Sequence, residues 1–353
     1  MPMRAVVLLA LFAIAAAAST VLLVRYGDLE APLVGRKGAG VVDDRAALLE
    51  SAERASIADH HAALLDSHDI DYRVLTVATG TDLERTAHDY FAEATVGARS
   101  DGGRGLLLVI DTAAERVRLE VSTSLEGVYT DAFVAYVQNR QMAPFFAAGR
   151  VADGVLATTE LIVGRAQEAD AGAAFSPPMA PRSMGAGAGA SAAIGTSSDP
   201  SAELKRQTQS VHVAGLDPLQ VVESYLERMA NRDARPDLPL YSRDTVAMLR
   251  NWVVTAAQMD NVARTYRRCT VDAVRIRGDA AVVRYRVDER QCAPYFLRRE
   301  DGAWKLDLAT MSSAIRFNHE NQWRFRSQPA AEVAFAFEGW RIDRNGFPHA
   351  SSR

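Results

Sequence analysis

Three acidic residues stand out because glycines and hydroxyl residues flank them around a predicted hairpin. Asp101 precedes two glycines, Glu126 lies in a loop that starts at Ser122, and Asp131 follows a threonine. Carboxylate oxygens are the ligands that calcium and other hard cations prefer, and no His or Cys is near. The sequence therefore predicts a site for calcium or another divalent cation, held by Asp101, Glu126 and Asp131. The alternative is that Asp131 caps a helix, Asp101 belongs to a turn, and Glu126 is a solvated loop charge.

A β-hairpin is expected to position these carboxylates. Residues 106–110 form an apolar run of strand length, and residues 116–121 alternate between charged and apolar side chains. The four residues between them allow a tight turn. Because the two strands are antiparallel, the loop after the second strand returns to where the first strand began. The loops 101–103 and 122–127 should therefore meet at one end of the sheet.

Several motifs follow one another in order along this part of the chain. They are Gly105-Leu-Leu-Leu-Val109, Arg116-Val-Arg-Leu-Glu120, Leu125-Glu-Gly127, Thr130-Asp131 and Pro144-Phe-Phe. With these motifs the stretch resembles the TPM domain family, which includes thylakoid-lumen proteins of photosystem II repair and many bacterial membrane-anchored proteins. The resemblance covers roughly residues 42 to 168. It implies an α/β sandwich with a mixed sheet, and some relatives are associated with a weak acid phosphatase activity.

Helical spacing and capping residues predict the remaining elements of this domain. Pro144 should break a helix, and the two phenylalanines after it should enter the core. The expected elements are a helix over residues 43–67 with Asp43 or Asp44 near its N-cap, a strand over 72–78, a helix from Asp82 to about 96, a helix from Thr130 or Asp131 to 141, and a helix over 152–167.

Several literal matches to catalytic motifs lack the context that their chemistry needs. Asp59-His60-His61 lies inside a predicted amphipathic helix and is interpreted as a solvated face. Asp111 ends a strand like a phosphorylated aspartate, but Ala113 stands where a second acid is needed. Ser122, Thr123 and Ser124 have no evident partner base, so the catalytic residues are unknown.

The N-terminus holds twenty uncharged residues, which begin at Ala5 and end at Val24. At a rise of about 1.5 Å per residue they are long enough to span a bilayer core. The segment is predicted to be a single-pass signal-anchor, with a cleaved signal peptide as the alternative. Either interpretation sends the bulk of the chain out of the cytoplasm, into the periplasm.

A composition change separates a second domain. Of residues 171–200, 23 are Gly, Ala, Ser or Pro, which predicts a flexible linker. Asp217 and Pro218 then start a helix. The layout that follows resembles the nuclear-transport-factor-2-like (SnoaL-like) cone. The expected elements are helices over 218–230, 243–258 and 329–337 and strands over 267–276, 281–287, 293–299 and 304–308.

Two features of this second domain leave alternatives open. Tyr285, Tyr295 and Trp304 either line a pocket or fill the core. Cys269 and Cys292 either form a disulfide or remain as thiols. A flat sheet would hold the cysteines about two strand spacings, roughly 10 Å, apart, which exceeds the reach of a disulfide unless the sheet curls.

The expected organisation is thus an anchor (1–25), a TPM-like α/β domain (40–168), a flexible linker (169–215) and an α+β cone-like domain with an antiparallel sheet (216–345). A net charge of −4 argues against nucleic acid as a partner. The sequence predicts an extracytoplasmic interaction, assembly or quality-control factor for envelope or membrane protein complexes. The alternative is a weak metal-dependent acid phosphatase that acts through the TPM-like cleft.

Overall fold

A computed structural model describes residues 40–80, 82–176, 192–193 and 213–350. The described chain divides into two compact units. The first contains residues 40–138, 151–176 and 192–193, and the second contains residues 139–150 and 213–350. The predicted membrane segment and most of the predicted linker lie outside the described residues.

The first unit is built on a five-stranded mixed sheet in the order β1-β2-β3-β4-β5. β1 and β3 both run parallel to β2, whereas β4 pairs antiparallel with β3 and with β5. The predicted α/β class with a mixed sheet is confirmed. The strands are β1 (Val42–Asp44), β2 (Asp71–Val77), β3 (Gly105–Asp111), β4 (Arg116–Val121) and β5 (Ala192–Ala193).

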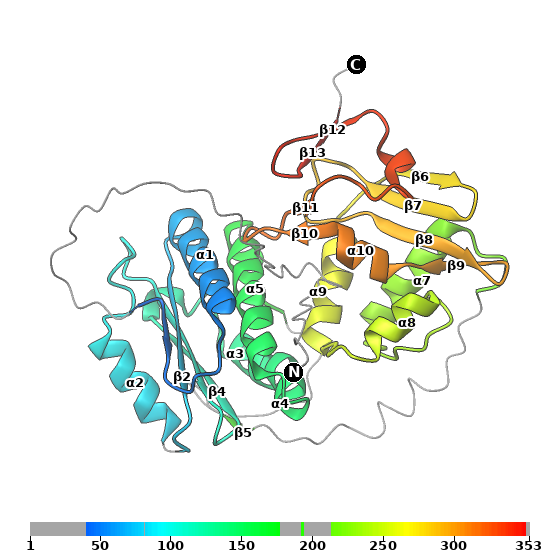
Figure 1. Cartoon of the computed structure of the whole chain (residues 1–353). Coiled ribbons are helices and arrows are strands. Elements are labelled where there is room, and N and C mark those ends of the chain that lie inside the picture. The colour runs from blue at the N-terminus through cyan, green and yellow to red at the C-terminus, as the bar shows by residue number, and fades with distance from the viewer. Residues whose placement is uncertain (1–39, 81, 177–191, 194–212, 351–353) are drawn as a thin grey trace. The chain divides into compact units, whose positions relative to one another are not determined.

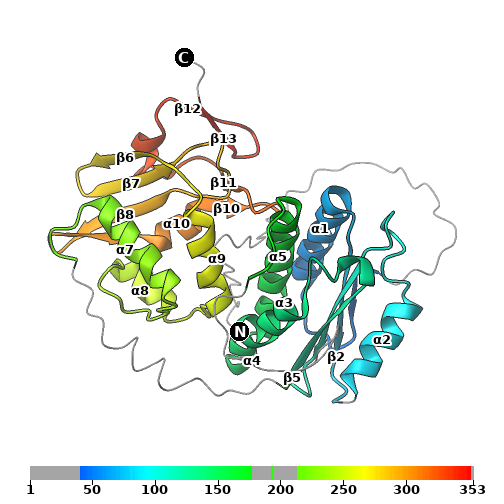
Figure 2. The same ribbon diagram turned by 180° about the vertical axis from the view of Figure 1, so that it is seen from behind.

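Helices cover both faces of this sheet. α1 (Ser51–His68) and α5 (Val151–Asp170) lie on one face and α2 (Leu83–Glu93) on the other (Figures 1 and 2). All seven residues of β2 and of β3 are buried, as expected for central strands covered on both sides. Asp82 caps α2 as predicted, because its carboxylate accepts the N–H groups of Glu84 and Arg85.

The predicted start of the first helix was wrong. Val42–Asp44 is strand β1, and α1 begins only at Ser51, behind a capping box formed by Glu50 and Glu53. The carboxylate of Asp44 does accept backbone N–H groups, those of Leu48 and Leu49, at 2.9 Å each. Asp44 therefore caps the connecting turn and not the helix.

Pro144 does not break the helix, so that prediction was also wrong. α3 (Asp131–Tyr136) runs on through the π-helical segment Val137–Met142 into α4 (Ala143–Ala147). Pro144 lies in the first turn of α4, directly after the π-helical segment. Phe145 and Phe146 are buried, as predicted.

The second unit packs helices against a four-stranded antiparallel sheet in the order β6-β7-β8-β9. Asp217 and Pro218 start α7 as predicted, with Gln220 completing a capping box. The likeness to the nuclear-transport-factor-2-like cone stays a prediction. The elements are α7 (Pro218–Ala230), α8 (Arg243–Leu249), α9 (Ala256–Tyr266), β6 (Val271–Arg277), β7 (Ala280–Tyr285), β8 (Tyr295–Glu300), β9 (Ala303–Leu306), α10 (Leu308–Ala314), the pair β10 (Ile315–Phe317) and β11 (Trp323–Phe325), the 3-10 turn η3 (Ala334–Phe337), and the pair β12 (Trp340–Ile342) and β13 (Pro348–Ala350).

Two helix predictions in this unit need correction. The single helix expected over 243–258 is the pair α8 and α9, because Thr255 caps a new helix through a capping box with Gln258. The helix expected over 329–337 is only the 3-10 turn η3. Short apolar runs do not fix where a helix restarts.

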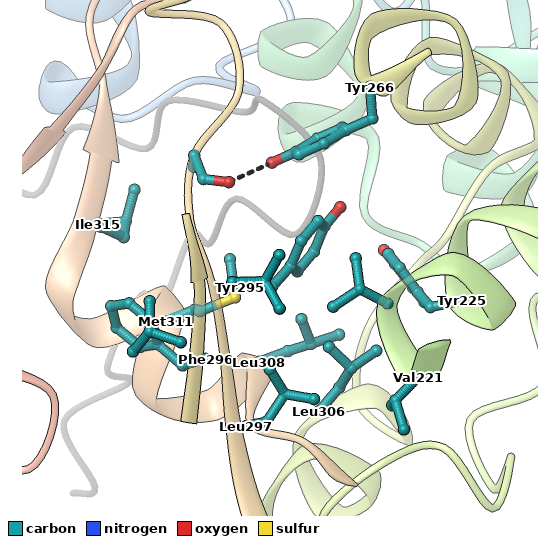
Figure 3. Packing of buried hydrophobic residues seen from close by; sticks show 14 of the residues in the cluster. Val221, Tyr225, Tyr266, Tyr295, Phe296, Leu297, Leu306, Leu308, Met311 and Ile315 are labelled. Carbon is teal, nitrogen blue, oxygen red and sulfur yellow. Dashed lines mark hydrogen bonds between the residues drawn. The ribbon is translucent and has the colours of Figure 1, made fainter. Parts of the chain in front are cut away.

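Tyrosine rings fill the centre of the second unit. Tyr225, Tyr266 and Tyr295 are buried among aliphatic side chains, and the hydroxyl of Tyr266 donates to the carbonyl of Ala293 at 2.9 Å (Figure 3). Burial raises the pKa of all three hydroxyls above the ordinary value for tyrosine. Tyr285, Tyr295 and Trp304 belong to this same cluster, so they are core residues.

Cys269 and Cys292 form a disulfide, with their Cα atoms 6.4 Å apart. Cys269 lies between α9 and β6, and Cys292 lies in the loop between β7 and β8. Because neither cysteine is inside a strand, sheet spacing does not hold them apart. The disulfide alternative is thus the one that the structure contains.

Each helix in the described part of the chain is too short or too polar to cross a membrane.

Candidate functional site

The two predicted loops do meet, at the end of the first sheet where β2 and β3 begin. Gly105 pairs with Asp71 on one side, and on the other its N–H donates to the Ser122 hydroxyl at 2.9 Å. Ser122 returns its own N–H to the Gly105 carbonyl, also at 2.9 Å. A Cβ on Gly105 would lie 2.7 Å from the Val96 carbonyl oxygen, so this close approach requires glycine.

The side chain of Asp69 fixes the turn at Asp101 through hydrogen bonds. Asp69 ends α1 in the left-handed conformation, with φ of 54°. Its carboxylate accepts the N–H of Asp101 at 2.7 Å and that of Gly102 at 2.9 Å. Desolvation by itself would raise the pKa of Asp69, but these two N–H groups hold it below its ordinary value. The turn is therefore pinned through its backbone, which leaves the Asp101 side chain exposed.

Beside that turn, a buried ion pair anchors the next loop. Asp71 is fully buried and accepts two hydrogen bonds from the Arg73 guanidinium, at 3.0 and 2.8 Å, and one from the Gly97 N–H at 2.9 Å. Arg73 also donates to the Ala94 carbonyl at 2.8 Å. Burial would raise the pKa of Asp71, yet Arg73 and Gly97 hold it below its ordinary value. Both partners of the pair are thus engaged in holding residues 94–97.

His61 completes this network, and its prediction as a solvated residue was wrong. His60 and His61 are both buried, whereas Asp59 is exposed. Nδ1 of His61 lies 2.7 Å from the Tyr72 carbonyl, so it carries the proton and donates. Nε2 then faces Nη1 of Arg99 at 3.3 Å. Burial lowers the pKa of His61, and the charge of Arg99 adds to that effect.

The three predicted metal ligands are all exposed. Their carboxylates take part in no hydrogen bond or ion pair with other described residues. Thr130, and not Asp131, caps α3, since its hydroxyl accepts the Phe133 N–H. Within the described ranges, no group of three or more His, Cys, Asp or Glu side chains is placed to hold a metal ion. Metal binding by Asp101, Glu126 and Asp131 stays a prediction.

The Ser122 and Ser124 hydroxyls at this end contact each other and the backbone. The Oγ atoms of Ser122 and Ser124 are 3.1 Å apart and share a hydrogen bond. The Ser124 hydroxyl also donates to the Gly103 carbonyl at 3.5 Å. Within the part of the chain that the structure describes, neither hydroxyl is hydrogen-bonded to a His, Asp or Glu side chain. A serine nucleophile needs such a base.

The carboxylate of Asp111, at the opposite end of β3, is also fully engaged in hydrogen bonds to the backbone. Asp111 is fully buried, and its carboxylate accepts the N–H groups of Gly80, Ala113 and Ala114 at 3.0 to 3.1 Å. This carboxylate ties the end of β2 to the hairpin turn. Because it accepts three backbone N–H groups, this carboxylate is poorly placed to act as a nucleophile, as the sequence also indicated.

Sequence reasoning missed Asp69, Asp71 and Arg73. One signal was available: Asp71 and Arg73 stand two residues apart at the start of an otherwise apolar strand, so they share a face. A buried charge on such a face needs a partner close by. The αL backbone of Asp69 left no comparable trace in the sequence.

The first unit is similar to a known domain family. Residues 42–165 match the TPM domain family, a range that runs from β1 into α5 and covers under half of the chain. The solution NMR structure of the N-terminal domain of a protein from P. gingivalis is 26% identical, covers 37% of this chain and 83% of its own, and superposes with a TM-score of 0.31. No curated protein matches the chain. The family match thus assigns a TPM domain to residues 42–165.

Proposed function

We propose that the protein is a membrane-anchored, extracytoplasmic factor that binds envelope or membrane proteins during their assembly or quality control. One observation carries this proposal: the buried carboxylates at the two ends of the first unit's sheet, Asp71 and Asp111, accept hydrogen bonds from backbone N–H groups. Asp71 and Asp111 accept hydrogen bonds that fix loops, as does the more exposed Asp69. A fixed surface with exposed carboxylates suits recognition better than proton transfer, which needs groups free to change charge.

The disulfide supports the extracytoplasmic part of the proposal. Disulfides persist in oxidising compartments such as the periplasm and are rare in the cytosol. Cys269 and Cys292 are the chain's two cysteines, and they are bonded to each other. The apolar segment that begins at Ala5 and ends at Val24 supplies an export signal and an anchor in the same proposal.

Site-specific photo-crosslinking in intact cells tests the proposal. A photoreactive residue is placed at position 126, in the loop beside β4, and as a matched control at position 113, in the exposed turn at the other end of the same hairpin. The proposal predicts one defined membrane-protein adduct from position 126 and none from position 113. Identical background labelling from both positions would contradict it.

A weak metal-dependent acid phosphatase is the second candidate. It is favoured by the exposed carboxylates of Asp101 and Glu126, which lie on two loops joined by the contact between Ser124 and Gly103. Calcium held by two carboxylates and water would polarise a phosphoryl oxygen. Calorimetric titration of calcium into the full chain, with an Asp101→Ala, Glu126→Ala variant beside it, tests this site. Equal heats from the two proteins would contradict a calcium ion shared by Asp101 and Glu126.

A further inference from the structure

The sheet of the second unit has one covered edge and one open edge. At the β9 edge, Leu306 donates its N–H to the Leu240 carbonyl at 2.7 Å and accepts that of Ser242 at 2.9 Å. Residues 240–242 therefore satisfy that edge. At the other edge, β6 pairs with β7 and with no other described strand. Among the described residues the outer side of β6 therefore has no paired strand, although η3 contacts this strand, and an unpaired edge is where another strand can add.

This open edge carries an apolar row. Val271, Val274 and Ile276 are the exposed large hydrophobic residues of the described chain, at 38%, 37% and 54% exposure. They pair with Tyr285, Val283 and Ala281, which alternate along β7, so all three lie on one face of the sheet. Apolar side chains gathered on one edge strand are typical of a docking surface.

The opposite face of the same strand carries uncompensated positive charge. Arg275 and Arg277 alternate with the apolar row, and neither has a carboxylate partner among the described residues. Arg277 instead stacks over the Phe335 ring, with its Cζ 4.5 Å from the centroid. The sheet's other arginines are all paired: Arg284 with Asp272, Arg298 with Asp307, and Arg299 with Asp279.

We propose that β6 is the docking site for an extended acidic segment of a partner protein. The segment adds as a strand, places apolar side chains against Val274 and Ile276, and places Asp or Glu residues against the two arginines. A second copy of β6 fits poorly, because Asp272 is the one acid of β6 and it is already paired with Arg284, which leaves none to neutralise the two arginines. This inference deepens the proposed function by stating the partner's chemistry, but the binding it predicts is testable without knowing the partner.

Fluorescence anisotropy with a synthetic peptide tests the proposal on the full-length chain. The probe is fluorescein-labelled Glu-Val-Glu-Val-Glu-Val-Glu, and the same peptide with Lys in place of Glu is the charge control. We expect the acidic peptide to bind and the basic one not to bind. The double variant Arg275→Glu, Arg277→Glu should weaken binding at least about fivefold, as expected for two exposed ion pairs. Arg344→Glu, the same change in an exposed turn, should stay within about twofold.

Hydrogen exchange on the same complex distinguishes strand addition from a loose charge contact. We expect the acidic peptide to slow exchange of β6 amides and to leave β9 unchanged. Equal binding of both peptides, undiminished binding to the Arg275 and Arg277 variant, or no protection of β6 would each overturn the proposal. Concentration-dependent self-association that protects β6 without peptide would overturn it in favour of a second copy. None of these outcomes depends on the crosslinking from position 126.

Discussion

Removing the Asp71 carboxylate should destabilise the TPM domain more than any exposed substitution. Asp71→Ala leaves the Arg73 guanidinium and the Gly97 N–H buried without their acceptor. Breaking a buried pair by deleting one partner costs about 3 to 5 kcal/mol, because an uncompensated charge remains inside. A cost of about 4 kcal/mol shifts the unfolding equilibrium roughly a thousandfold.

The assay has to report on the first unit separately. The four tryptophans lie at positions 252, 304, 323 and 340, so their fluorescence follows the second unit. Hydrogen exchange of the buried amides in β2 and β3 follows the first. We expect those amides to exchange roughly a thousandfold faster in Asp71→Ala, while the tryptophan signal in urea unfolds at an unchanged midpoint.

Two further variants serve as controls for Asp71→Ala. Asp101→Ala removes an exposed carboxylate without a side-chain partner at the same sheet end, and should change stability by no more than about 0.5 kcal/mol. Replacing both charges, as Asp71→Leu with Arg73→Met, should cost less than Asp71→Ala, since no buried charge is left. A loss below about 1 kcal/mol for Asp71→Ala would refute the view that this pair anchors the loops.

Three further predictions concern the disulfide, a buried histidine and the Asp101 turn. Replacing Cys269 and Cys292 by serine opens a link across 23 positions, and tryptophan fluorescence in urea should show the second unit losing about 3 kcal/mol. Because burial lowers the pKa of His61, the unfolded chain binds the extra proton first. The free energy of unfolding should therefore be at its full value above about pH 6.5 and fall as the pH drops towards the folded pKa. Measured by urea unfolding at several pH values, it should depend less on pH in His61→Asn than in the wild type. Asp69→Ala removes the acceptor of two backbone N–H groups, so hydrogen exchange at Asp101 and Gly102 should accelerate about tenfold while β3 keeps its protection.

The sequence was sufficient where local chemistry and strand periodicity agree. Alternation over residues 116–121 and the buried run before it predicted the hairpin, and its antiparallel register is the reason that the Asp101 and Ser122 loops meet. Asp82 and Asp217 were recognised as caps because a cap depends only on its next three residues. Such features need no knowledge of distant contacts.

Features set by distant parts of the chain were beyond this reasoning. β1 is a strand because β2 lies beside it, and nothing within residues 42–44 reveals that neighbour. His60 and His61 are buried because α1 packs against both β2 and α5, although the sequence of their own helix predicts an amphipathic, solvated one. The approach of Cys269 to Cys292 depends on the loops outside the strands, which strand spacing does not describe.

Phosphate release by the full-length chain is the measurement that tests the central claim most directly. The wild type and the Asp101→Ala, Glu126→Ala variant are assayed at acidic pH on a phosphate monoester, with and without added calcium. An interaction factor predicts the same background rate for both proteins under both conditions. A calcium-dependent turnover that the wild type shows and the variant lacks would contradict it and establish the exposed carboxylates as a catalytic metal site.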